Sequence, residues 1–162
     1  MLQHFIDRFV QWCYYSQDYA FIRDPKYGVP FLQSAHLTGI TLLLGTILAL
    51  NLRLLGVGLG RLPLPYLAGQ LWPWMKTGLV LTIVAGILVF LPDPTRYAHS
   101  GPFRLKMALL CIALLYQFTI FRATVRKDPE SGTKLRKIVT ASVSLLLWFG
   151  VGWSGRAIAF FQ

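Results

Sequence analysis

The sequence predicts an all-α fold: a four-helix transmembrane bundle, preceded by an N-terminal amphipathic helix that lies along the membrane interface. The first indication is composition, since 55% of the residues are hydrophobic and only 14% are charged. A soluble domain carries about 25% charged residues because its surface faces water. The second indication is a set of four apolar runs, each long enough to cross a bilayer. We therefore expect residues 1–162 to form a single membrane domain.

Residues 2–25 are expected to form the interfacial helix and a linker. Apolar side chains recur three and four residues apart, at Leu2, Phe5, Ile6, Phe9, Val10 and Cys13. Polar side chains occupy the opposite face, at Gln3, Asp7, Arg8 and Gln11. A helix with this division lies in the interface rather than crossing it. Charged residues scattered through the same segment argue against a cleavable signal peptide.

The four predicted spans contain 19 to 23 residues each, close to the roughly 20 that a helix needs to cross the hydrocarbon. They are Phe31–Asn51, Trp72–Leu91, Phe103–Phe121 and Ile138–Phe160. Prolines mark their ends, at Pro30, Pro73, Pro92, Pro94 and Pro102. Small residues at helical spacing favour close packing within the bundle, or contact between copies of the chain. These are Thr41, Gly45 and Ala49 in the first span, and Gly150 and Ser154 in the last.

The distribution of basic residues predicts the orientation. The loop after the first span and the loop after the third lie on one side, which holds nine basic and two acidic residues with Lys76 included. The other side holds seven basic and four acidic residues. Because positively charged loops stay in the cytoplasm, we expect both termini on the outer face. The net charge of +10 is then a signal of topology and headgroup contact rather than of nucleic-acid binding.

Ionisable residues inside the predicted spans are the candidate functional residues, because they are costly in lipid and usually functional. His36 lies six residues past Pro30, which is about 9 Å into the first span. Lys106 lies one turn past Pro102, and Arg156 lies about one turn from the end of the last span. All three fall at similar depth in the outer half, where acidic residues are few. The group predicts a site for an anionic ligand.

Haem b fits this expectation, with His36 as axial metal ligand and Lys106 or Arg156 on the propionates. His99, in the outer loop above Lys106, is the candidate second axial ligand, with Lys106 or water as alternatives. Gly39, three residues after His36, is expected to leave room for the macrocycle. A quinone oxygen or a lipid phosphate would also fit. In a purely structural interpretation, His36 hydrogen-bonds another helix and the two cations extend to headgroups.

Other chemistries lack their motifs in this sequence. There is no CxxCH segment for covalent haem and no phosphate-binding loop that opens a helix. Cys13 belongs to the interfacial helix and Cys111 lies well inside the third span, so we expect no disulfide between them.

Several segments resemble a bacterial family of small four-helix membrane proteins of unknown function. They are Ala35–Gly39, Asn51–Gly56, Phe103–Lys106 and Trp153–Ile158. More distantly, a histidine early in the first helix and a lysine opening the third resemble the copper-resistance D-like membrane proteins and the small haem-carrying protoporphyrinogen oxidases of bacteria. In the latter group the first-helix histidine is associated with haem b, which the resemblance carries over to His36. We accordingly expect a multi-pass protein of the bacterial inner membrane with periplasmic termini.

The sequence thus predicts a cytochrome-like redox protein or subunit that binds b-type haem near the outer face. Its expected partners are membrane lipid and a quinone or a periplasmic redox protein. An alternative is a non-catalytic accessory subunit, within an oligomer or a larger complex, whose polar residues bind lipid or a neighbouring chain. A copper-handling membrane protein is a further alternative, which the three histidines and three methionines support weakly because they form no Met-rich tract.

Overall fold

The fold is that of a computed structural model, which describes residues 8, 26–58, 62–91, 100–126 and 133–157. All the secondary structure of the described residues is helical, and four helical segments are long and apolar enough to cross a membrane. The predicted all-α four-helix transmembrane fold is therefore confirmed. The predicted interfacial helix lies outside the described residues except for Arg8, and so does the loop that contains His99.

Each helix begins before its predicted span. The first two are α3 (Gly28–Leu55) and α4 (Leu64–Phe90). The third span is continuous but changes geometry, from α6 (Gly101–Tyr116) through a π-helix η1 (Gln117–Phe121) to α7 (Arg122–Arg126). The fourth is α8 (Lys134–Ala157).

The start of the second span was predicted wrongly. Pro73 was expected to open this helix, but α4 begins at Leu64 and contains Pro73 in its interior. The signals that begin the helix are Pro63 at its N-cap and Pro65 in its first turn, where a missing N–H costs nothing. A transmembrane helix tolerates an interior proline because neighbouring groups satisfy the freed backbone atoms. The carbonyl that Pro73 leaves without a helical donor is that of Gly69, one turn earlier.

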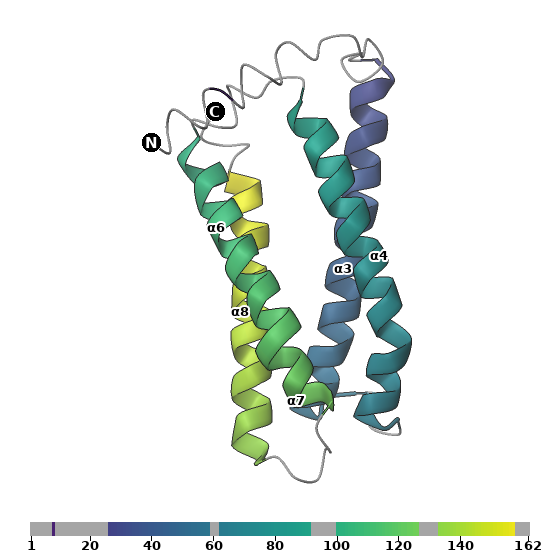
Figure 1. The fold of residues 1–162 in the computed structure, drawn as a ribbon, viewed down its shortest axis with the longest axis vertical. Helices are drawn as coiled ribbons and strands as arrows, with labels where there is room; N and C mark the ends of the chain where they lie inside the picture. Colours follow the sequence, from purple (N-terminus) through teal and green to yellow (C-terminus); the bar gives the residue numbers. More distant parts are fainter. Residues whose placement is uncertain (1–7, 9–25, 59–61, 92–99, 127–132, 158–162) are drawn as a thin grey trace.

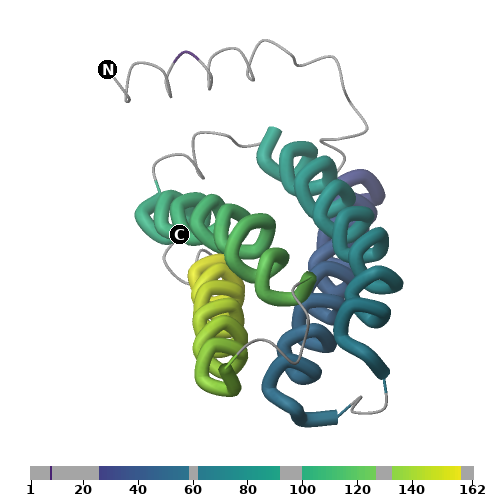
Figure 2. The backbone as a smooth tube through the Cα atoms, turned by 60° about the horizontal axis from the view of Figure 1, so that its bottom comes forward, coloured from purple at the N-terminus to yellow at the C-terminus, as the bar shows by residue number. Residues whose placement is uncertain are grey.

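The bundle is built from two helix pairs, α3 with α4 and α6 with α8 (Figure 1). The pairs meet through α3 and α8, and through α4 and α7 near the loops that follow α3 and α7. Figure 2 shows that α6 and α8 cross each other at a clear angle, whereas α3 and α4 run side by side.

Glycines hold α3 against α4. A Cβ atom on Gly39 would lie 2.7 Å from the backbone nitrogen of Thr82, and one on Gly78 would lie 2.7 Å from that of Leu43. The two backbones therefore touch at a distance that no other residue permits. Such small-residue contacts drive helix association in lipid, where the hydrophobic effect does not. The result is a closely packed pair that fixes the groups attached to it.

The small residues singled out in the sequence divide between two roles. Gly150 packs in the bundle, since a Cβ there would lie 3.3 Å from Leu109, and Ser154 is buried. On α3, Thr41 and Gly45 are exposed, and nothing lies within 4 Å of a Cβ placed on Gly45. The close contact of α3 uses Gly39 instead.

Apolar packing is concentrated in one half of the bundle. We call the two ends of the bundle the core end and the open end. At the core end, α3 stops and α4 begins. At the open end, α3 begins and α8 stops. One buried cluster joins α3, α4, α7 and α8 near the core end, and a second fills the middle around Leu43, Met75 and Trp148. In α6 the only buried residue is Ala113, so its first three turns have none.

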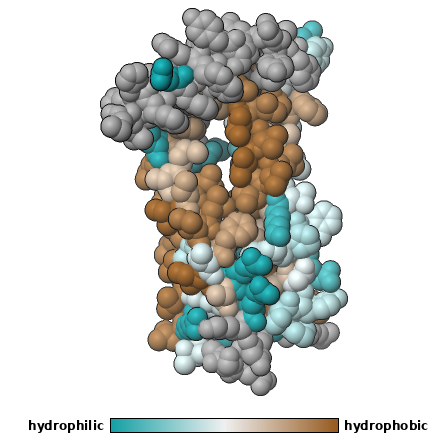
Figure 3. Space-filling view, in the orientation of Figure 1, coloured by the Kyte–Doolittle hydropathy of each residue, from teal (hydrophilic) through white to brown (hydrophobic). Residues whose placement is uncertain are grey.

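Between the pairs, the space-filling view shows an opening near the open end (Figure 3). The rings of Phe90 on α4 and Phe103 on α6 stack at 5.6 Å, so these two helices meet again close to their ends. The opening is therefore bounded by the Phe90–Phe103 contact toward the open end and by the packed middle of the bundle toward the core end.

Candidate functional site

His36 is held by a hydrogen bond to the neighbouring helix. It lies on α3, is half-buried, and its Nδ1 atom is 2.9 Å from the backbone oxygen of Thr82 on α4. A carbonyl oxygen only accepts hydrogen bonds, so Nδ1 carries the proton and donates it. In the neutral imidazole the lone pair then lies on Nε2. The backbone carbonyl thus fixes the tautomer of His36 in which Nε2 is the acceptor nitrogen.

Gly86 makes the space for the imidazole ring. A Cβ atom at this position would lie 2.9 Å from Cε1 of His36 and 3.3 Å from Nδ1. The ring therefore packs directly on the backbone of α4, one turn beyond Thr82. Hydrogen bond and glycine together restrict both the position and the rotation of the ring.

Lys106 approaches from the other helix pair. Its side chain is half-buried and runs along Gly155 of α8, where a Cβ atom would lie 3.6 Å from Cε and 3.7 Å from Nζ. Its charge is close enough to interact electrostatically with His36. Two of the predicted site residues, one from each helix pair, are thus within electrostatic range of each other.

The other predicted site residues are less clearly part of this arrangement. Arg156 follows Gly155, which Lys106 contacts, but its side chain is exposed whereas that of Lys106 is half-buried. The space beside Gly39 is filled by Thr82 and Gly78 of α4, so the room expected there for a macrocycle is taken by helix packing. His99 lies outside the described residues.

The site carries one positive charge, on Lys106, and no described negative charge. The six acidic residues of the chain all fall outside the described ranges, so no carboxylate is described near Lys106. Within those ranges there is also no group of three or more histidine, cysteine or acidic side chains that would hold a metal ion by itself. The arrangement offers one imidazole lone pair and one ammonium group. It suits a metal that brings most of its own ligands, or an anion.

Sequence reasoning missed the residues that support this site. Thr82 and Gly86 position His36, and Gly155 accommodates Lys106. One signal was present, because Gly78, Thr82 and Gly86 recur every four residues along one face of the second span.

A second polar group lies deep in the core end, and sequence reasoning missed it too. The Asn51 amide donates to Ser144 at 3.1 Å, and Ser144 donates to Gln117 at 3.4 Å. The Gln117 amide faces the sulfur of Met75 at 3.7 Å. These four side chains are almost fully buried and come from all four spans, and the π-helix begins at Gln117. Among the described residues Asn51 Oδ1 has no hydrogen-bond donor, so this network is only partly satisfied.

In comparisons with known proteins, the model of a family of unknown function, DUF6644, matches residues 10–161. No curated protein matches the chain, and neither does any solved structure. The resemblance to a family of unknown function is thereby confirmed, whereas the more distant similarities stay predictions. Since the match covers nearly the whole chain, the protein belongs to this family.

Proposed function

We propose that this member of the DUF6644 family is an integral membrane protein that binds haem b, with Nε2 of His36 as an axial ligand, and that it transfers electrons. The observation that carries the proposal is the 2.9 Å hydrogen bond between His36 Nδ1 and the Thr82 carbonyl. Metal-ligating histidines almost always donate their second ring N–H to a carbonyl or a carboxylate. Such a bond fixes the tautomer, orients the ring and raises the basicity of the ligating nitrogen.

Rigidity of the ligand supports the same proposal. The close contacts at Gly39 and Gly78 fix α3 relative to α4, and Gly86 seats the ring. His36 therefore loses little further freedom when it binds a metal.

Lys106 supplies the charge that an anionic cofactor requires. Haem b carries two propionate groups, and an ammonium group forms charge-assisted hydrogen bonds with carboxylates. Lys106 is held along Gly155, and its charge acts on His36. It would bind a propionate, or serve as second axial ligand if His99 does not.

When bound, haem b would supply one-electron transfer at the potential set by its ligands and surroundings. The roles of the chain are to orient His36 through Thr82, to place a cation beside the cofactor and to exclude water through the packed middle of the bundle. An absorption spectrum of the purified protein, before and after reduction, tests the proposal directly.

The proposed location is the bacterial inner membrane, with the open end and both termini at the periplasmic face. The support is the excess of basic residues in the loops at the core end. A site near the periplasmic face would exchange electrons with a quinone in the membrane or with a periplasmic redox protein.

A second candidate is an accessory subunit without catalytic activity. The exposed small-residue face of α3 favours it, because Thr41 and Gly45 leave room for another helix to approach. In this case the His36 bond to Thr82 joins two helices and Lys106 binds lipid. A colourless purified protein would select this candidate.

A further inference from the structure

A basic and aromatic site lies between α4 and α7, away from His36. The Arg122 guanidinium lies over the ring of Trp72, 5.3 Å from its centroid. Phe118, one turn before Arg122, meets the same ring edge-on at 5.7 Å. The cation is therefore held in place by the indole, which itself packs on the middle of the bundle.

More positive charge lies beside this pair. Lys76 follows Trp72 by one turn of α4, Arg126 follows Arg122 by one turn of α7, and all three basic side chains are exposed. No acidic residue occurs in α4 or in α6 through α7. We call Trp72, Lys76 and Arg122 the Arg122 site.

The Arg122 site also contains an unused hydrogen-bond donor. The indole Nε1 of Trp72 is buried and has no acceptor among the residues that the structure describes. The buried N–H is not itself accessible, whereas the two cations beside it are exposed and suit the oxygens of a phosphate.

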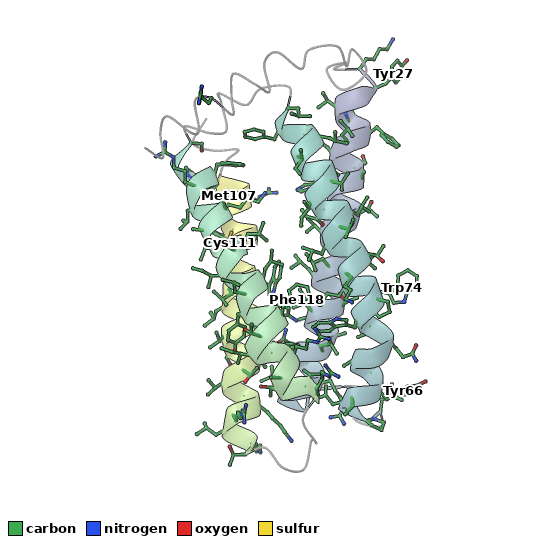
Figure 4. The ribbon with its side chains drawn as sticks, viewed as in Figure 1. Tyr27, Tyr66, Trp74, Met107, Cys111 and Phe118 are labelled. Atoms are coloured by element: carbon green, nitrogen blue, oxygen red, sulfur yellow. The ribbon has the colours of Figure 1, made fainter. Side chains whose placement is uncertain are left out.

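Its depth matches the headgroup region of a bilayer. Tyr66 and Trp74 of α4 are each 58% exposed and point away from the bundle (Figure 4). Exposed aromatic residues of this kind mark the membrane interface. On the face drawn in Figure 3, hydrophilic surface gathers over α4 and α7, and hydrophobic surface continues toward the open end.

We propose that the Arg122 site binds an anionic phospholipid, with the phosphate between Lys76 and Arg122 and the acyl chains along the apolar surface of α4 and α6. Arginine suits phosphate because its planar fork donates two parallel hydrogen bonds. A net anionic headgroup is favoured over a zwitterionic one because the site carries no described counter-charge. This inference is independent of the haem proposal, and a colourless protein would leave it intact.

Native mass spectrometry of the detergent-purified protein tests it, with phosphatidylglycerol and phosphatidylcholine of identical acyl chains as probes. Wild type should retain phosphatidylglycerol in preference to phosphatidylcholine. The double variant Lys76→Gln/Arg122→Gln should lose phosphatidylglycerol retention by roughly 25-fold, since each basic residue near an anionic surface contributes about fivefold.

The matched control is Lys134→Gln/Arg136→Gln, which removes two exposed basic residues from the first turn of α8. It changes the net charge equally and should retain the lipid as wild type does. Phenylalanine holds a cation less strongly than tryptophan, so Trp72→Phe should loosen Arg122 and reduce retention severalfold, whereas Trp74→Phe should not. Equal retention of the two lipids by wild type would overturn the proposal, as would equal losses in the Lys76/Arg122 variant and its control.

Discussion

His36 and Thr82 are joined across the α3–α4 pair by a 2.9 Å hydrogen bond from the imidazole Nδ1 to a backbone oxygen. The acceptor is a main-chain atom, so no substitution of Thr82 removes it. The orientation of the imidazole is therefore set by how closely the two helices approach, and the glycines between them control that approach.

Replacing Gly86 with alanine should displace the His36 ring, because the added Cβ would lie 2.9 Å from Cε1. Overpacking of this kind costs about 1–3 kcal/mol. We expect a lower melting temperature and a lower haem-to-protein ratio, measured by thermal unfolding and by pyridine haemochrome absorbance. Gly69→Ala on the same helix, where a Cβ meets nothing within 4 Å, is the control. If Gly86→Ala binds haem as wild type does, the seating of the ring does not matter for ligation.

Replacing Gly39 should act on the fold rather than on a cofactor directly. A Cβ there would lie 2.7 Å from both the backbone nitrogen and the hydroxyl of Thr82. Gly39→Ala should therefore push α3 from α4 and destabilise the protein by about 1–3 kcal/mol. Gly45→Ala on the same helix should be neutral or slightly stabilising, because alanine is the better helix former. Equal melting temperatures for the two variants would contradict the backbone contact.

Lys106 and Arg156 should differ in their effect on the cofactor. Lys106 is half-buried and interacts with His36, whereas Arg156 is exposed. A nearby positive charge favours the reduced state, so Lys106→Gln should lower the haem reduction potential by roughly tens of millivolts. Arg156→Gln, which removes the same charge, should shift it much less. Redox titration of both variants decides this, and equal shifts would show that Lys106 has no special position.

The proposed topology predicts opposite accessibility for two engineered cysteines. In a background with Cys13 and Cys111 replaced by serine, Ser131→Cys should be protected from an impermeant thiol reagent in intact cells. Gln162→Cys should be labelled. The reason is the basic residue cluster of the loop after α7, which favours the cytoplasm. The reverse pattern would place His36 near the cytoplasmic face.

Much of the fold could be predicted because hydropathy and span length are properties of the sequence alone. The proline signal failed at Pro73, since a membrane helix can contain a proline that a soluble helix rarely tolerates. The close packing at Gly39 and Gly78 could not be assigned from spacing, because Thr41 and Gly45 show a similar pattern and are exposed. Which of the faces lined by small residues meets a neighbouring helix depends on the rotation of each helix about its axis.

The site could be predicted only in part for the same reason. His36 and Lys106 were found because ionisable residues are rare in spans. Depth along a helix did not distinguish Lys106 from Arg156, which differ in the direction they face. The hydrogen-bond acceptor of His36 is a backbone oxygen, and every residue has one, so the identity of the side chain at that position does not reveal it. The buried Asn51, Gln117 and Ser144 carry no charge and so were overlooked.

The most direct measurement is the absorption spectrum of the purified protein and of its His36→Ala variant, with His4→Ala as the control. Wild type and His4→Ala should show a Soret band and, on reduction, the α and β bands of b-type haem. His36→Ala should lose these bands while it stays folded, because a transmembrane hydrogen bond contributes only about 0.6 kcal/mol on average. A folded His36→Ala variant with the wild-type spectrum, or a wild-type protein without haem, would contradict the account.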